Sequence, residues 1–230
     1  VGGREFPWTH EVMAMEEVGV LGAALGCAFA MPSIVGEALT RFGTEAQKEK
    51  FLKPILQGRR ISAEALTEPR GGSDFFGATT RARRVGREFE VVGSKRFIVG
   101  AQEADVFTAY VRTGEEGAPP HKSISLLIVE RQPGVKVEYL YGLMGTRGGG
   151  TGRVTFSNVR VPEEVIGDVL ARITTGLVCA RRLEEFMTDQ KLDDLSTVSR
   201  LLQDRAEASM RRAIEETERR RTLFSRSCQR

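Results

Sequence analysis

The sequence predicts an α+β protein with N-terminal helices, a central antiparallel β-barrel or sandwich, and further helices at the C-terminal end. Two observations support this prediction. Apolar residues recur at helical spacing before about residue 60, alternate with period two up to about residue 168, and then return to helical spacing. The short apolar runs of the central zone follow one another without helices between them, which is typical of antiparallel sheets. We therefore expect three domains, at residues 1–60, 61–168 and 169–230.

The N-terminal zone is expected to form closely packed helices. Gly19, Gly22 and Gly26 lie among alanines and leucines, and no strand precedes them. We therefore interpret them as a small-residue packing surface and not as a phosphate-binding loop. Farther along, Thr44 is followed three residues later by Gln47, which is the spacing of a capping box, so a helix is predicted to begin there.

The central zone contains five predicted strands, and sequences rich in Gly and Pro separate several of them. Turns are expected at residues 92–95, 117–120 and 133–134. The strands are expected at residues 87–92, 106–111, 124–129, 135–139 and 154–161.

Composition excludes several classes of protein. The 34 basic and 31 acidic residues leave a net charge of +3, which is small for a protein that binds the nucleic-acid backbone. No uninterrupted apolar run approaches the roughly 18 residues that indicate a transmembrane helix, so no membrane span is expected. The chain opens without a charged and apolar leader, and a cytoplasmic location is therefore the expectation.

Metal and thiol sites are not expected either. Cys27, Cys179 and Cys228 share no close spacing, which argues against a zinc ribbon, a redox pair and a disulfide scaffold. The two histidines, His10 and His121, lie in terminal or loop-like settings, so neither a histidine-based triad nor a metal-ligand cluster is predicted.

Two segments of the central zone have residues suited to chemistry. In residues 65–74, Pro69 is followed by two glycines, Ser73 and Asp74, which predicts a tight loop with bare backbone N–H groups. Such a loop either approaches a flat, anionic or carbonyl-rich ligand closely or forms a solvent turn that closes a strand. In residues 93–100, a hairpin-like turn leads into a strand in which Phe97, taken alone, would be a core residue.

Together these two segments resemble the acyl-CoA dehydrogenase family. Residues 61–74 resemble the family's TEPxAGSD loop, which lies against FAD. Residues 89–99 are similar to its GxKxWIT strand, with Phe97 at the Trp position and Val99 at the Thr position.

Two further segments support this resemblance, which extends from about residue 11 to residue 168. Residues 41–52 resemble the helix before the loop, and residues 145–164 resemble the end of the family's β-domain. Four segments in the family's order make the resemblance specific. It implies N-terminal helices, a small β-barrel and a C-terminal four-helix bundle. Because family members are longer at both ends, it also implies partial helical domains here, with a truncated bundle.

The resemblance implies FAD as cofactor and α,β-dehydrogenation of an acyl-CoA thioester in fatty acid metabolism, with electrons passing to an electron-transfer flavoprotein. A carboxylate removes the α-proton while hydride leaves the β-carbon for the flavin. Thr67 would stabilise charge on the reduced flavin, Phe97 would stack on the ring, and Ser73 would also face the pantetheine of the substrate. The implied flavin-side residues are Glu64, Ala65, Leu66, Thr67, Gly72, Ser73, Phe97, Ile98 and Val99.

The sequence departs from the family pattern at two points. Val99 lacks the family's Thr hydroxyl, so we expect altered flavin electronics, with the Val99 backbone N–H still available to the ring. The late segments that supply the usual catalytic Glu have no recognisable counterpart. Some relatives place the base on the first bundle helix, which makes Glu184 and Glu185 candidates. Both lie beside arginines, and a surface ion pair is the alternative interpretation.

Three functional hypotheses follow. The first is an FAD-dependent acyl-CoA dehydrogenase. The second is an oxygen-using flavin oxidase or monooxygenase of the same fold, and the third is a non-catalytic binding or assembly subunit. Self-association into a homo-dimer or homo-tetramer is also expected, because Leu195, Val198 and Leu202 of a truncated bundle would need to be covered.

Overall fold

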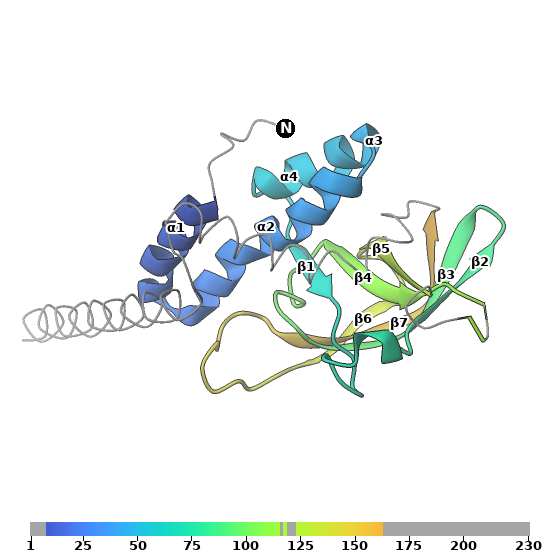
Figure 1. Ribbon diagram of the computed structural model, residues 1–230. Coiled ribbons are helices and arrows are strands. Elements are labelled where there is room, and N and C mark those ends of the chain that lie inside the picture. The colour runs from blue at the N-terminus through green and yellow to red at the C-terminus, as the bar shows by residue number, and fades with distance from the viewer. Residues whose placement is uncertain (1–7, 116, 119–122, 163–230) are drawn as a thin grey trace, which may run out of the picture. The chain divides into compact units, whose positions relative to one another are not determined.

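The computed structural model of the protein describes residues 8–115, 117–118 and 123–162 (Figure 1). The expected helical domain at 169–230, with Glu184, Glu185 and the apolar positions expected to drive self-association, lies outside these described residues. Within the described part, residues up to Gly26 belong to one compact unit, and residues from Cys27 onward belong to a second unit, which contains the sheet.

Helices occupy the N-terminal part of the described chain, as predicted. They are α1 (Trp8–Leu21), α2 (Ala23–Phe42), α3 (Glu45–Gln47), the π-helical turn η1 (Lys48–Leu52) and α4 (Lys53–Leu56). The predicted capping box is confirmed. The Thr44 hydroxyl accepts a 3.3 Å hydrogen bond from the Gln47 amide, and the Gln47 side-chain oxygen accepts a 2.7 Å bond from the Thr44 amide.

Among the described helices, α2 is long and apolar enough to cross a membrane by length and composition, with a mean hydropathy of 1.4 in its most apolar window. Core helices of soluble proteins have the same properties. Here Val35 and Leu39 are almost fully buried, in one core cluster with Phe51 of η1 and Ile128 of strand β5 (Ile124–Glu130). This part of α2 therefore packs in a core that it shares with the sheet.

The sheet has seven strands in the described residues, and five of them lie near the predicted positions. Strands β1 and β2 were not predicted, because β1 is only 4 residues long and β2 reads Arg-Ala-Arg-Arg-Val, without an alternating apolar pattern. The strands are β1 (Ser62–Ala65), β2 (Arg81–Val85), β3 (Glu88–Ile98), β4 (Val106–Arg112), β5, β6 (Val135–Leu140) and β7 (Gly152–Pro162).

The strand order is β1-β4-β2-β3-β7-β6, and β5 also pairs with β4. The pairs β2–β3, β3–β7, β6–β7 and β4–β5 are antiparallel, as expected. The strands β1 and β2 depart from this arrangement, because both pair with β4 in parallel. The chain passes through a loop and the β2–β3 hairpin after β1, and this long connection allows β4 to return beside β1 in the same direction.

Strand β3 runs without interruption through the segment 92–95, where a turn was expected. Gly93 has φ +151°, and the pairing of β3 with β7 shifts in register between Val91 and Gly93. A Cβ atom at Gly93 would lie 2.6 Å from the Cα of Thr80. The glycine that suggested a turn therefore permits a β-bulge and a close approach of two backbones.

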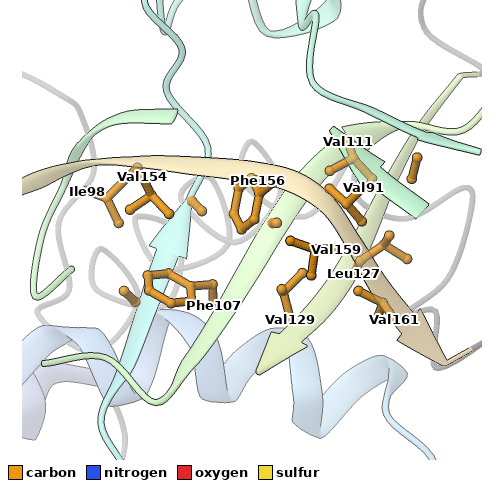
Figure 2. Packing of buried hydrophobic residues seen from close by; sticks show 14 of the residues in the cluster. Val91, Ile98, Phe107, Val111, Leu127, Val129, Val154, Phe156, Val159 and Val161 are labelled. Atoms are coloured by element: carbon orange, nitrogen blue, oxygen red, sulfur yellow. The ribbon is translucent and has the colours of Figure 1, made fainter. Parts of the chain in front are cut away.

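A hydrophobic core fills the inner side of the curled sheet (Figure 2). Phe107 of β4 and Phe156 of β7 meet edge to face, with their ring centroids 6.4 Å apart, so distant strands of the sheet face each other across this core. Val91 and Ile98 of β3 join them with almost no exposed surface. The alternating pattern that predicted the strands thus places one set of side chains inside.

Replacement of Gly93 by Ala should lower the free energy of unfolding by more than the roughly 1–2 kcal/mol that a positive φ alone costs a non-glycine residue. The added methyl group would overlap the Thr80 backbone. Gly86→Ala is the matched control, since Gly86 has φ +66° and open space around it. Chemical denaturation of the three proteins tests this expectation, and equal losses in the two variants would contradict the steric explanation.

Candidate functional site

Strand β1 leads directly into residues 66–74, here called the site loop. The Arg96 amide near the end of β3 donates a 2.8 Å hydrogen bond to the Thr67 carbonyl. The two segments that the sequence singled out, which lie about thirty residues apart, are therefore neighbours in the fold. The predicted residues Glu64–Thr67 therefore belong to one of the two segments that meet at this contact, and Phe97–Val99 belong to the other.

The site loop presents backbone N–H groups of the kind predicted. Glu68 and Gly71 exchange backbone hydrogen bonds of 3.0 and 3.2 Å, which close a tight turn. Beyond this turn, no described residue accepts a hydrogen bond from the N–H groups of Thr67, Gly72, Ser73 or Val99. A Cβ at Gly72 would lie 3.2 Å from the Thr67 hydroxyl oxygen, so glycine leaves room for that side chain. Such donors suit a carbonyl-rich or anionic ligand.

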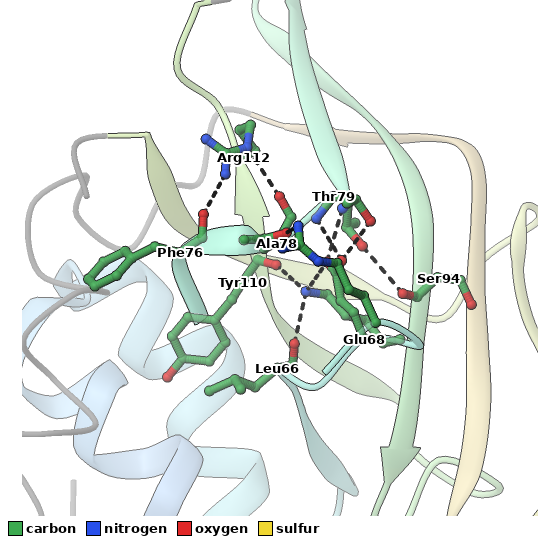
Figure 3. A network of polar contacts seen from close by, with 12 residues as sticks. Leu66, Glu68, Phe76, Ala78, Thr79, Ser94, Tyr110 and Arg112 are labelled. Atoms are coloured by element: carbon green, nitrogen blue, oxygen red, sulfur yellow. Dashed lines mark hydrogen bonds and ion pairs between the residues drawn. The ribbon is translucent and has the colours of Figure 1, made fainter. Parts of the chain in front are cut away.

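A buried ion pair lies beneath the site loop (Figure 3). The Lys95 ammonium of β3 is 2.9 Å from a Glu68 carboxylate oxygen, and the two side chains have exposed fractions of 0% and 3%. The same carboxylate accepts hydrogen bonds from the Thr79 amide and hydroxyl and from the Thr80 amide, at 2.6–2.9 Å. A buried carboxylate with four donors is fully satisfied, so this pair is an ordered part of the fold.

Lys95 also holds two backbone carbonyls. Its ammonium donates to the Leu66 carbonyl at 3.0 Å and to the Tyr110 carbonyl at 2.5 Å. Together with Glu68, these acceptors use all three N–H groups of an ammonium. One side chain therefore joins the site loop to strands β3 and β4.

The pKa of the Glu68 carboxyl departs strongly from its ordinary value. Burial alone would raise this pKa above its ordinary value of 4.5. The Lys95 charge and the hydrogen bonds from Lys95 and Thr79 lower it by a larger amount, so that the pKa is about 2. Burial lowers the pKa of the Lys95 ammonium, and this effect is larger than the opposing effect of Glu68, which raises it. The carboxylate of Glu68 is therefore ionised at neutral pH.

Phe97 is not the core residue that its strand alone suggested. Its side chain is 43% exposed and its φ is +56°, an uncommon value for a residue with a side chain. The ring contacts Tyr141, with centroids 4.4 Å apart, and the Arg96 guanidinium lies 4.2 Å from its centre. An exposed aromatic ring therefore follows directly after Arg96, the residue whose amide binds the site loop.

The side chains of the other predicted residues differ in their placement. The side chains of Ala65 and Ile98 are buried in the core of the sheet, so only their backbone is available to a ligand. The Glu64 carboxylate accepts a 3.1 Å hydrogen bond from the Tyr110 hydroxyl. Leu66 is partly buried against the core that includes α2, and Ser73 is exposed on the site loop.

An open pocket of about 380 Å³ adjoins the site loop. Its lining includes Arg70, Arg81 and Arg112. Glu115 is the acidic residue of this lining. Arg112 donates to the carbonyls of Phe76 and Ala78, which fixes its guanidinium at the pocket wall. Arg70 is also paired with Asp74 at 2.8 Å, so the three guanidinium groups exceed the two nearby carboxylates and leave the pocket basic. In the described residues, no group of three or more His, Cys, Asp and Glu side chains could hold a metal ion.

Sequence reasoning assigned no role to Glu68, Lys95 and Tyr110, although the first two lie within the quoted motifs. A detectable signal was present for Lys95. Lys95 occupies an inward position of a strand whose other inward positions are apolar, such as Val91 and Ile98, and a cation there requires a buried partner. Its partner lies 27 positions away on a loop, and the strand pattern does not identify it.

Two family models match most of the described chain. The model for the N-terminal domain of acyl-CoA dehydrogenases matches residues 1–59, and the model for their middle domain matches residues 63–159. The chain thus belongs to the acyl-CoA dehydrogenase family. A third model, for hydantoinase B and oxoprolinase, matches residues 145–229 and overlaps only the end of the middle domain.

Individual relatives agree with this assignment. Mitochondrial isovaleryl-CoA dehydrogenase from Pongo abelii is 32% identical over 163 residues, which cover 70% of this chain and 38% of that protein. An acyl-CoA dehydrogenase structure from Geobacillus kaustophilus matches with a TM-score of 0.71 at 26% identity, covering 100% of this chain and 66% of that one. Glutaryl-CoA dehydrogenase from Mycobacterium smegmatis, in complex with FADH2, matches with a TM-score of 0.64 at 25% identity. This match covers 75% of this chain and 43% of that one. The chain thus spans about two fifths of the length of the isovaleryl-CoA dehydrogenase.

Acidification should destabilise the protein through Glu68. Because the folded-state pKa of Glu68 lies below the unfolded value, its ionised form stabilises the fold fully above about pH 4.5, and this stabilisation is lost as the pH falls toward 2. We expect the free energy of unfolding to fall between pH 5 and pH 2 by about 2 kcal/mol more in the wild type than in Glu68→Gln. Denaturant titrations across this range measure the difference, with Glu49→Gln as the control for losing a surface carboxylate. Parallel curves for the wild type and Glu68→Gln would be the contrary result.

Proposed function

We propose that this chain supplies the N-terminal and middle domains of an FAD-dependent acyl-CoA dehydrogenase. The observation that carries the proposal is the pairing of two segments through the hydrogen bond from the Arg96 amide to the Thr67 carbonyl. One segment has the Thr67, Gly72 and Ser73 N–H groups and the other has the Val99 N–H and the exposed Phe97 ring, and no described residue accepts from these four N–H groups. These are flavin-side positions that the family resemblance implies. The residues fit the cofactor, because amide donors suit its carbonyl-rich ring and an aromatic ring can cover one face.

FAD, when bound, supplies the oxidant that takes hydride from the β-carbon of the acyl group. The chain's own residues would orient it and stabilise the product of that step. The Thr67 N–H and hydroxyl would donate to the side of the ring that gathers negative charge on reduction. Phe97 would cover the ring and exclude water from it. Ser73, exposed on the site loop, would also face the thioester-bearing arm of the substrate.

The basic pocket supports an acyl-CoA as the substrate class. Coenzyme A has several phosphate groups, and Arg70, Arg81 and Arg112 line a pocket of about 380 Å³ beside the site loop. An electron-transfer flavoprotein is proposed as the electron acceptor by the family resemblance. Reoxidation of the reduced flavin by air within seconds would favour instead an oxidase or monooxygenase of the same fold.

Removal of the Phe97 ring should weaken FAD binding. Stacking on an aromatic ring contributes about 0.5–1.5 kcal/mol, so Phe97→Ala is expected to raise the Kd for FAD by about 2–13-fold. Val92→Ala is the control, because Val92 is an exposed apolar residue of the same strand and is not among the implied flavin-side residues. Titration of FAD followed by flavin fluorescence measures both variants. If the wild type fails to bind FAD, the proposed function is overturned.

The chain alone is expected to be a poor dehydrogenase. Removal of the α-proton requires a carboxylate, and general-base catalysis is typically worth about 10²–10⁴ in rate. Glu184 and Glu185 lie in a segment matched by the hydantoinase B and oxoprolinase model, which supports the absence of the family's own base from this chain. We expect purified chain with FAD, several acyl-CoAs and an artificial acceptor to turn over well below the 1–10³ per second of ordinary enzymes. Ordinary turnover that Glu184→Gln or Glu185→Gln abolishes would instead establish a relocated base.

A further inference from the structure

We propose that Lys95 is a positioning residue that aims and polarises the Thr67 backbone N–H toward the flavin, through its hydrogen bond to the Leu66 carbonyl. This inference rests on the proposed function. It adds a charge dependence to the flavin site that neither the TEPxAGSD loop nor the aromatic position accounts for.

One peptide group, between Leu66 and Thr67, links Lys95 to the Thr67 N–H. The Leu66 carbonyl and the Thr67 N–H belong to the same peptide bond, which is planar and trans, so they point in opposite directions. The Lys95 ammonium, fully buried, holds that carbonyl at 3.0 Å from the inner side. The Thr67 N–H must therefore point away from Lys95, and no described residue accepts it there.

Hydrogen bonds of the Thr67 carbonyl and the Glu68 side chain hold this peptide group on its C-terminal side. The Glu68 carboxylate binds Lys95 at 2.9 Å and accepts from the amides of Thr79 and Thr80. The Thr67 carbonyl accepts from the Arg96 amide at 2.8 Å. The residues before and after Thr67 are thus both bound to one ammonium, and rotation of the Leu66–Thr67 peptide would break the bond to Lys95.

The charge of Lys95 adds a second effect. A cation that binds a carbonyl withdraws electron density from the amide, which makes the N–H of the same peptide a stronger donor. A stronger donor favours the anionic reduced flavin over the neutral oxidised one. The ammonium can therefore act on the flavin through a peptide bond while remaining in the core, where its own charge is balanced by Glu68.

The test compares reduced and oxidised flavin, because a purely structural role of the pair would affect both. We expect Lys95→Met to weaken binding of reduced FAD about tenfold more than binding of oxidised FAD. For a two-electron couple this corresponds to a midpoint potential lower by about 30 mV. Spectroelectrochemical titration of the FAD-loaded proteins gives these values.

Val161→Ala is the stability control, because Val161 is buried in the same core on strand β7, outside the two site segments. It should lower stability and leave the potential unchanged. If Lys95→Met fails to fold, Lys95→Gln provides a second variant that keeps a donor and removes the charge. A wild-type potential in a folded Lys95 variant that binds FAD would overturn this inference alone. Absence of FAD binding by the wild type would overturn the proposed function, and the Thr67 amide nitrogen shift in cofactor-free Lys95→Met then still tests the effect on the peptide.

Discussion

The Lys95–Glu68 ion pair is the interaction on which the arrangement of the site depends. A buried pair of this kind is costly to form, and removal of one partner typically costs about 3–5 kcal/mol because the other charge remains uncompensated. In this protein the pair is complete: each ammonium proton has an oxygen, and the carboxylate has donors from the chain entering β2. These bonds connect the site loop to β3, to β4 and to the chain entering β2, in addition to the hydrogen bond from the Arg96 amide to the Thr67 carbonyl.

This arrangement separates two roles within a short stretch of sequence. The inward groups of the loop, the Leu66 carbonyl and the Glu68 side chain, are bound to Lys95. The N–H groups of Thr67, Gly72 and Ser73 on the same loop have no acceptor among the described residues. A rigid inner layer and a set of exposed donors on the same loop are what a preorganised electrostatic site requires, since its donors need no reorganisation during reaction.

The sequence predicted the helices, the capping box at Thr44 and five of the seven described strands, because each of these is specified by a local pattern of side chains. It did not predict β1 and β2, whose place is set by pairing with the distant strand β4, and it read the bulge at Gly93 as a turn. At the site, the motifs singled out the two segments but did not indicate which of their residues face inward. The exposure of Phe97 depends on its positive φ, and the role of Lys95 depends on a partner from another segment.

The parallel pairing of β1 with β4 also constrains the order in which the chain can fold. Ser62 pairs with Val106, and Glu88 at the start of β3 pairs with Pro162 at the end of β7, so the sheet is built from contacts that are distant in sequence. Long-range pairing of this type slows folding, because the entropy of closing the intervening chain is lost before the contacts form. During synthesis, the apolar face of the early strands must therefore wait for β7 to emerge, and that interval is when chaperone binding or aggregation would act on this protein.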